Sequence, residues 1–271
     1  MKNPQLLQKS MLQAALAAGK VLTRYFEKTF EVREKDQAGL VTNADLEAEA
    51  AVIRILRKAR PDFGFLAEES GQVQAARAGA SDGRWIIDPL DGTTNFVHGF
   101  PMFCVSIAAE WQGQIVAGVI HHPILKESTW ASLGKGAWVL RGGSRKRVTV
   151  SKTQRLKNSL LTTGFTYRKR ELHLEMGPFE RLSGIARAIR RPGSAALDLA
   201  FTARGVFDGF WERNLSPWDV AAGILLIQEA GGKVTDFSGN PFQIEGSEIL
   251  ATNGLIHEDI QNTLQPQSCP I

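Results

Sequence analysis

The chain has 271 residues, of which 43% are hydrophobic and 22% charged, with a formal net charge of +4 and a pI near 9.1. This composition excludes a disordered or fibrous protein, and the length fits one large domain or two closely packed halves. Because 32 basic residues nearly balance 28 acidic ones, we expect no direct nucleic-acid partner.

The two cysteines, Cys104 and Cys269, are too few for a disulfide framework and lack the spacing of metal ligands. We expect two free thiols in a reducing compartment. The sequence has no cationic start followed by an apolar signal core, and no apolar run approaches the roughly 20 residues of a membrane span. A soluble, cytoplasmic protein without membrane contact is therefore expected.

Helical spacing of apolar residues predicts a long first helix over residues 3–29 and a second helix over 42–61. The polar stretch 31–40 between them is expected to be a hairpin or a mobile loop. Asp45 lies in the first turn of the second helix, where the simplest interpretation is a capping box with Thr42.

Strands dominate the next part of the chain. One strand over 63–70 ends in the adjacent acids Glu68 and Glu69, and another over 85–87 leads into Asp-Pro-Leu-Asp-Gly at 88–92. Alternation of apolar residues then predicts antiparallel strands at 103–111, 114–120, 127–132 and 137–140. The basic run 141–152 is expected to be a solvated connection, with phosphate contact as the alternative.

The remaining chain alternates between predicted strands and predicted helices. Strands are predicted at 159–163, 207–212, 233–237 and 248–251. Helices are predicted at 171–190, 194–204, from 216 to the glycine pair at 231–232, and at 257–264. Strands and helices in layers predict a mixed α/β or α+β fold, and we find no internal repeat.

Acidic residues stand at the ends of several of these elements. Each has an ordinary explanation by itself, and Asp219 in particular fits a capping box after Ser216. Acids gathered in one cleft repel one another, however, and a bound cation usually relieves this repulsion. A set of oxygen ligands without His or Cys favours Mg²⁺, Mn²⁺ or Ca²⁺ over Zn²⁺. The set is Asp45, Glu68, Glu69, Asp88, Asp91 and Asp219.

Gly92 and Thr93 follow Asp91 directly, and backbone N–H groups in such a turn can receive an anion. A simple Asp-Gly loop is the alternative for this motif alone. A phosphate that bridges cations fits this arrangement best. The uncatalysed hydrolysis of a phosphate monoester is so slow that it requires up to about 10²¹-fold acceleration. Since cation clamping is the standard solution, the sequence predicts metal-assisted phosphomonoester hydrolysis.

Three motifs together resemble the inositol monophosphatase family, within the Mg²⁺-dependent, Li⁺-sensitive phosphatases. They are Leu-Ala-Glu-Glu-Ser at 66–70, Trp-Ile-Ile-Asp-Pro-Leu-Asp-Gly-Thr-Thr-Asn-Phe at 85–96 and Trp-Asp-Val-Ala-Ala-Gly at 218–223. The continuation to Pro101 resembles the inositol branch more than the branches acting on 3′-phosphoadenosine nucleotides, fructose bisphosphate or histidinol phosphate. The resemblance covers nearly the whole chain and implies a layered αβαβα sandwich that forms a homodimer.

The resemblance also implies two Mg²⁺ ions and a third, weakly held ion. Glu68, Asp88 and the carbonyl of Leu90 would hold the first ion, and Glu68 would also touch the third. Asp88, Asp91 and Asp219 would hold the second ion, beside the leaving group. Lys35 matches a family lysine only if its loop is shortened by one residue.

Further roles follow from the same resemblance. Thr93 and Glu68 would orient the attacking water, with Asp45 behind the Thr93 hydroxyl. The N–H groups of Gly92 and Thr93 would receive the phosphate. The leaving polyol would be bound by Asp91, Asp219, Glu212 and the turn Gly193, Ser194 and Ala195.

The chain is thus interpreted as a phosphatase of inositol-1-phosphate. It would have an N-terminal half, 1–145, with the antiparallel sheet and most metal ligands, and a C-terminal half, 146–271, with substrate-binding elements and the site between them. One alternative is a broader sugar or nucleotide phosphatase acting on 3′-phosphoadenosine nucleotides, NADP or fructose bisphosphate. Another is a second, non-catalytic role in binding the transcription machinery, suggested by the arginine-rich segment 187–193 at an expected helix end.

Overall fold

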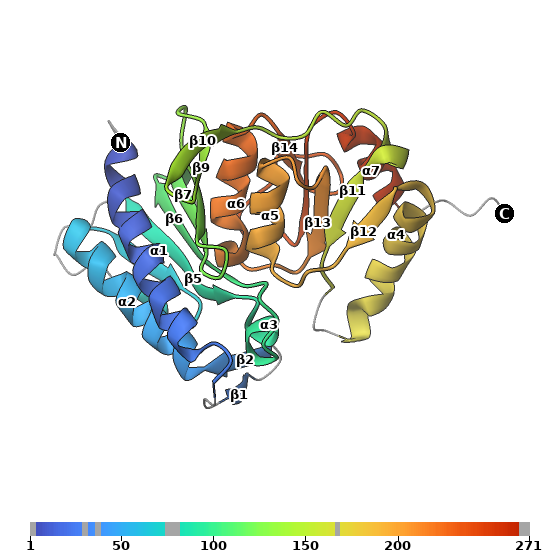
Figure 1. Ribbon diagram of the computed structural model, residues 1–271. Coiled ribbons are helices and arrows are strands. Elements are labelled where there is room, and N and C mark those ends of the chain that lie inside the picture. Colours follow the sequence, from blue (N-terminus) through green and yellow to red (C-terminus); the bar gives the residue numbers. More distant parts are fainter. Residues whose placement is uncertain (1–3, 29–31, 36–38, 74–81, 166–168, 266–271) are drawn as a thin grey trace.

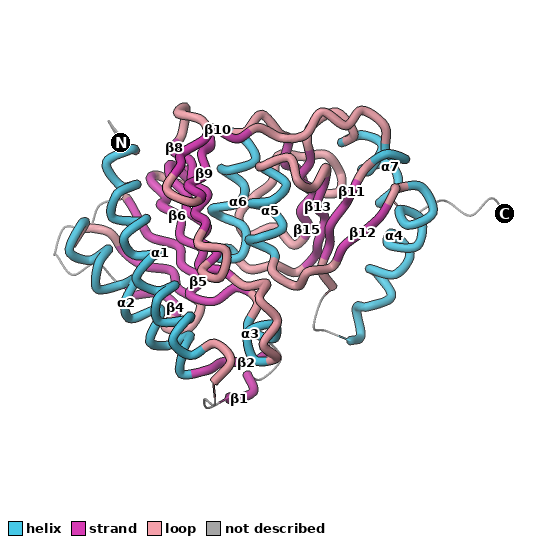
Figure 2. Tube along the Cα trace, viewed as in Figure 1, coloured by secondary structure: helices cyan, strands magenta, loops and turns pink. Residues whose placement is uncertain are grey.

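The computed structural model describes residues 4–28, 32–35, 39–73, 82–165 and 169–265, which form five layers (Figures 1 and 2). An outer helical layer covers the first sheet, a middle helical layer separates the two sheets, and a last helical layer covers the second sheet. This arrangement confirms the expected αβαβα sandwich. The layers contain α1 (Gln5–Tyr25) with α2 (Asn43–Ala59), α5 (Ala195–Ala203) with α6 (Pro217–Glu229), and α4 (Leu172–Ile185) with α7 (His257–Leu264).

The first sheet has eight strands, and all its neighbours pair antiparallel except β3 with β5. A separate hairpin of β1 (Val32–Lys35) and β2 (Gly39–Thr42) precedes α2. The order across the sheet is β10 (Ser144–Val148), β9 (Ala137–Arg141), β8 (Glu127–Ser132), β7 (Gln114–His122), β6 (Cys104–Trp111), β5 (Gly83–Asp91), β3 (Gly64–Ala67) and β4 (Gly71–Val73).

The second sheet has five strands and mixed pairing. β11 pairs parallel with both of its neighbours, whereas β15 pairs antiparallel with β13 and β14. The order is β12 (Ala188–Arg190), β11 (Leu160–Thr163), β13 (Gly209–Arg213), β15 (Glu248–Thr252) and β14 (Lys233–Thr235). The carboxyl ends of parallel strands meet at one edge of a sheet, which is where ligand sites form in α/β proteins.

The outer helices bury one apolar face each. In α1, Leu7, Met11 and Leu22 recur at helical spacing and are at most 2% exposed. α2 begins with the expected capping box, because the Thr42 N–H donates to Asp45 Oδ2 at 2.8 Å. Both helices belong to the same core cluster as Trp85 and Ile87 of β5.

The middle helices are apolar on nearly all sides, as expected for helices that lie between two sheets. Gly223 of α6 allows a close approach, since a Cβ there would lie 2.5 Å from Leu199 Cβ of α5. Gly118 of β7 does the same against α6, where a Cβ would lie 3.0 Å from Ala222 Cα. The two helices therefore form a rigid support between the sheets.

Two expectations about secondary structure are wrong. The helix expected over 171–190 ends at Ile185, and Ala188–Arg190 instead forms β12, because its backbone pairs with β11 from Leu160 to Thr162. The arginines of this segment therefore do not lie at a helix end. The connection expected over 141–152 contains β10, which extends the first sheet. The division of the chain at residue 145 stays a prediction.

Candidate active site

A cavity of about 140 Å³ opens where β5, β11 and β13 end and where α5, α6 and the short helix α3 (Thr93–Val97) begin. Both sheets and the middle helical layer contribute to it. Most of the predicted site residues line this cavity, namely Asp88, Leu90, Asp91, Gly92, Thr93, Gly193, Ser194, Ala195, Glu212 and Asp219. Sequence positions far apart thus meet in one pocket.

β5 delivers two of the acids through an irregular end. Its pairing with β6 shifts register between Asp88 and Asp91, where Pro89 has no N–H to donate. Asp88 Oδ1 accepts a hydrogen bond of 2.9 Å from the Leu90 N–H. Asp91 Oδ2 accepts from the Ser194 hydroxyl at 2.6 Å and from the Ala196 N–H at 2.7 Å. Asp91 therefore joins the end of β5 to the start of α5.

The turn after Asp91 requires a glycine. Gly92 has φ of 94°, and a Cβ there would lie 2.8 Å from the Met102 carbonyl oxygen. α3 begins at the next residue, and the Thr93 hydroxyl donates to the Leu90 carbonyl at 3.0 Å. The same hydroxyl lies 3.5 Å from Oδ1 of Asp45, which is fully buried at the start of α2. Asp45 is therefore beside Thr93, although it does not line the cavity.

α6 supplies Asp219, which forms a capping box with Ser216 and accepts from its N–H at 2.7 Å. The capping interpretation is therefore confirmed for this residue, as it is for Asp45. Capping uses one oxygen of the Asp219 carboxylate. The other oxygen can serve the cavity that the residue lines.

The site acids raise one another's pKa values. Burial, followed by the charges of Glu68, Asp91 and Asp219, raises the pKa of Asp88 well above its usual range. Burial is also the main cause that raises the pKa of Asp91 to about 6 and that of Asp219 to about 8. Glu68 does not line the cavity, but its charge acts on all three of these carboxyl groups.

This donor set fits a hard cation. It consists of carboxyl oxygens that face one cavity, and a divalent ion would relieve the repulsion between their charged forms. Within the ranges given above, no three Asp, Glu, His or Cys side chains converge closely enough to hold an ion as they stand. Asp91 and Asp219 each have an oxygen engaged by a backbone N–H. Binding therefore requires the remaining oxygens to turn toward the ion.

The opposite wall of the cavity comes from the second sheet and α5. Glu212 of β13 is 8% exposed, and its pKa is raised well above its usual range by burial and then by Asp198 and Asp219. Gly164 leaves the space that the Glu212 carboxyl occupies, since a Cβ there would overlap it. Gly193, with φ of 84°, forms the turn before α5.

Sequence reasoning missed three further residues at the site. Asn95 Nδ2 donates to the Pro192 and Met102 carbonyls at 2.8 and 2.7 Å and thereby ties α3 to the turn at Gly193. Asp198 lines the cavity from within α5, and Arg191 lines it with its guanidinium 4.6 Å from the ring centre of Phe165. Asn95 lies inside the quoted motif and could have been found, whereas nothing in the sequence marks Asp198.

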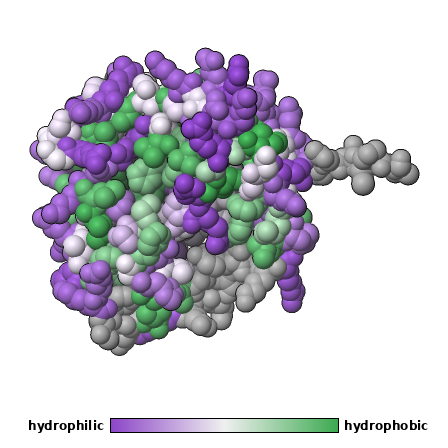
Figure 3. All heavy atoms as spheres, turned by 45° about the vertical axis from the view of Figure 1, so that its right-hand side comes forward, coloured by the Kyte–Doolittle hydropathy of each residue, from purple (hydrophilic) through white to green (hydrophobic). Residues whose placement is uncertain are grey.

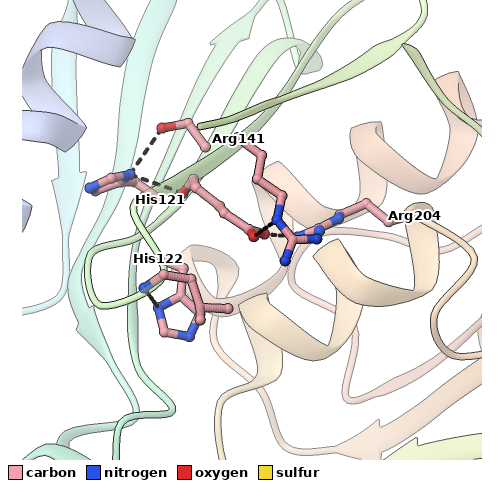
Figure 4. A network of polar contacts seen from close by, with 7 residues as sticks. His121, His122, Arg141 and Arg204 are labelled. Carbon is pink, nitrogen blue, oxygen red and sulfur yellow. Dashed lines mark hydrogen bonds and ion pairs between the residues drawn. The ribbon is translucent and has the colours of Figure 1, made fainter. Parts of the chain in front are cut away.

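A second buried polar cluster lies outside the cavity (Figure 4). Glu127, which is 3% exposed, accepts from Arg141 Nε at 2.8 Å and from Arg204 Nη1 at 2.6 Å. His121 Nδ1 lies 2.9 Å from the Ser128 hydroxyl. These contacts join β7, β8, β9 and the end of α5, so the cluster is structural.

The remaining expectations concern single residues and the molecular surface. Cys104 is a free, buried thiol, and Cys269 lies outside the described residues. Lys35 lies in β1, and the structure does not describe its side chain. Hydrophilic and hydrophobic side chains are interspersed on the face in Figure 3, and no described helix is long and apolar enough to span a membrane.

Comparison with known proteins identifies the family of this chain. The family model for the inositol monophosphatase family, which is metal-dependent, matches residues 3–268. Inositol-1-monophosphatase of Caulobacter vibrioides is 42% identical over 260 residues, which are 94% of this chain and 99% of the relative. Nus factor SuhB of Pseudomonas aeruginosa is 42% identical over 266 residues, 96% of each chain.

Solved structures agree as well. The crystal structure of extragenic suppressor protein SuhB from Bartonella henselae has a TM-score of 0.90 at 41% identity, covering 96% of this chain and 99% of that one. The match in sequence and fold thus extends over nearly the whole length. This chain therefore belongs to the inositol monophosphatase family and is a phosphatase.

Proposed function

We propose that the chain hydrolyses inositol-1-phosphate to inositol and phosphate with the help of Mg²⁺. The observation that carries this proposal is the group of carboxyl groups of Asp88, Asp91 and Asp219, which line one cavity and raise one another's pKa. Such a group is stable in its charged form beside a cation, and its oxygen chemistry favours Mg²⁺. The activity named for the Caulobacter relative supports the choice of substrate.

Two ions, with a third held weakly near Glu68, would be bound by the residues that the family resemblance assigns. Glu68, Asp88 and the Leu90 carbonyl would hold one ion, and Asp88, Asp91 and Asp219 would hold the other. Bound Mg²⁺ supplies Lewis-acid activation of water and stabilises negative charge on the leaving oxygen.

The chain's own residues would position the reacting groups. The Thr93 hydroxyl lies between the Leu90 carbonyl and the Asp45 carboxylate, and its position is therefore fixed by β5 and α2. We assign Thr93 and Glu68 to orienting the attacking water, and Asp45 to accepting a proton through Thr93. The N–H groups of Gly92 and Thr93 would bind the phosphate oxygens.

The leaving polyol would be bound on the opposite wall. Asp91, Asp219, Glu212 and the turn formed by Gly193, Ser194 and Ala195 are the residues that we assign to its hydroxyl groups. Asp91 is held there by α5, through the Ala196 N–H. Cytoplasmic location, Li⁺ sensitivity and a homodimer belong to the same proposal.

Phosphate release across a panel of substrates tests this proposal. The panel contains inositol-1-phosphate, fructose bisphosphate, NADP and a 3′-phosphoadenosine nucleotide, each with and without Mg²⁺ and Li⁺. We expect Mg²⁺-dependent, Li⁺-inhibited release, fastest from inositol-1-phosphate. Faster release from another member would favour the broader phosphatase. The Asp88→Asn variant should lose nearly all release while keeping its fold, and a variant near full rate would refute the assigned site.

A second role in binding the transcription machinery is favoured by the 42% identity to a relative named Nus factor SuhB. The exposed residue Arg190 at the end of the edge strand β12 is our candidate contact. Charge reversal in Arg190→Glu should remove a pull-down partner from this machinery. An unchanged set of partners and an unchanged oligomeric state would argue against this role.

A further inference from the structure

Asp198 is a buried acid at the cavity that the proposed mechanism does not use. It is 1% exposed and lines the cavity, and its Oδ1 atom is buried without a hydrogen-bond partner in the described part of the chain. An unpaired buried carboxylate oxygen is costly, so it requires a physical explanation.

The helix that carries Asp198 does not provide this explanation. Asp198 is the fourth residue of α5, and its own N–H donates to the Ser194 carbonyl at 3.0 Å as the first bond of the helix. Its side chain therefore does not cap α5. The N–H of Ala196, in the first turn, is already bonded to Asp91.

The neighbours of Asp198 indicate what its carboxyl group faces. The Thr162 side chain of β11 hydrogen-bonds to it, and its charge acts on Glu212 at the end of β13. Gly164, the residue after β11, leaves the room for the Glu212 carboxyl. Asp198 and Glu212 thus lie close to each other on the cavity wall, within range of the charge of Asp91 at the end of β5.

We propose that Asp198 and Glu212 form a pair of carboxyl groups that accepts hydrogen bonds from the hydroxyl groups of the leaving polyol. Asp198 is then a specificity-determining residue, and its unpaired Oδ1 accepts a hydrogen bond from a substrate hydroxyl. This inference rests on the proposed phosphatase function and names the substrate class that this wall selects.

The chemistry of the wall favours hydroxyl groups over the other ligands of a phosphatase. The free carboxyl oxygens are hydrogen-bond acceptors, and a second phosphate also presents mainly acceptors, so the pair disfavours bisphosphates. An apolar leaving group would bury both acceptors without a partner, and sites of this kind discriminate strongly against substrates that lack the donor. A polyol provides donors on several sides.

The test compares kcat/KM for inositol-1-phosphate with kcat/KM for phenyl phosphate, whose leaving group carries no further hydroxyl. The ratio of the two values does not depend on the fraction of enzyme that is folded. The variants are Asp198→Ala and Asp198→Asn, and the matched control is Asp208→Asn. Asp208 is also buried in the second half of the chain, but it accepts from Ser151 and Leu160 and does not line the cavity.

We expect the ratio to fall at least about tenfold in Asp198→Ala, mainly through a higher KM for inositol-1-phosphate. Asp198→Asn keeps one acceptor oxygen and should show a smaller fall, and the control should stay within about twofold of the wild type. If the wild type releases phosphate and the Asp198 variants keep the wild-type ratio of the two kcat/KM values, this inference is overturned and the proposed function stands. A wild type that releases phosphate from neither substrate would overturn the proposed function and this inference with it.

Discussion

Replacing Asp219 by asparagine should remove activity and at the same time stabilise the metal-free protein. Asp219 lies at the start of α6 beside other acids of the cavity, and its pKa is raised from 3.8 to about 8, mainly by burial and then by the charge of Asp91. The carboxylate form is therefore the unfavourable form in the folded, metal-free state. Asparagine has nearly the same shape and cannot ionise.

The size of the effect follows from the pKa. A rise from 3.8 to about 8 corresponds to about 6 kcal/mol between the protonated and charged forms. The protonated Asp219 carboxyl group therefore contributes to the free energy of unfolding. This contribution is fully present below pH 4 and is lost as the pH rises through 8. The asparagine amide can still accept from the Ser216 N–H, although a neutral acceptor costs about 1 kcal/mol relative to a charged one. We expect a net gain of at least about 2 kcal/mol at pH 8.

Urea unfolding in the presence of a chelator measures this gain at pH 8 and at pH 5, where the difference between variant and wild type should shrink. The Asp208→Asn control should lose stability at both pH values, because its carboxylate accepts two hydrogen bonds. Phosphate release with Mg²⁺ should fall at least about 100-fold in Asp219→Asn. A variant that is no more stable than the wild type at pH 8 would refute the argument from repulsion.

Three further predictions concern the surroundings of the site and the second polar cluster. Asn95→Ala should raise KM about tenfold, because the turn before α5 loses its amide anchor, and steady-state kinetics that show an unchanged KM would contradict this. Glu127→Gln should lower the free energy of unfolding by about 3 kcal/mol in urea, since Arg204 loses a buried partner, whereas Arg141→Gln, at a side chain 72% exposed, should cost less than about 1 kcal/mol. Burial lowers the pKa of His121 to about 4, so this residue lowers the free energy of unfolding as the pH drops from 6.5 toward 4, and urea unfolding should show that His121→Gln gains stability relative to the wild type over this range.

The acids at the ends of elements could be predicted because local chemistry marks them. Pro89 and Gly92 punctuate the turn around Asp88 and Asp91, and Ser216 followed by proline signals the helix start that carries Asp219. These turn and capping signals depend only on neighbouring residues in the sequence, so they can be identified without knowledge of the fold.

Other features depend on contacts between distant segments. Residues 186–190 continue a pattern compatible with a helix, but pairing of Ala188 with Leu160 makes a strand, and only the sheet determines this. Asp198 lies in the first turn of α5, within an apolar stretch, and belongs to no motif that the sequence analysis identified. Its position on the cavity wall follows from the packing of α5 against the ends of β11 and β13.

The acids that line the cavity, together with Asp45 beside it, also stabilise the starts of helices. Asp45 caps α2, Asp219 caps α6, and Asp91 accepts from the Ala196 N–H in the first turn of α5. Helix N-termini carry partial positive charge, so these three carboxylates keep their places in part through the helix dipoles. Asp88 is held instead by the N–H of Leu90 in its own strand and is repelled by its acidic neighbours. Asp88 is therefore the acid that depends most on a bound cation for its charged form.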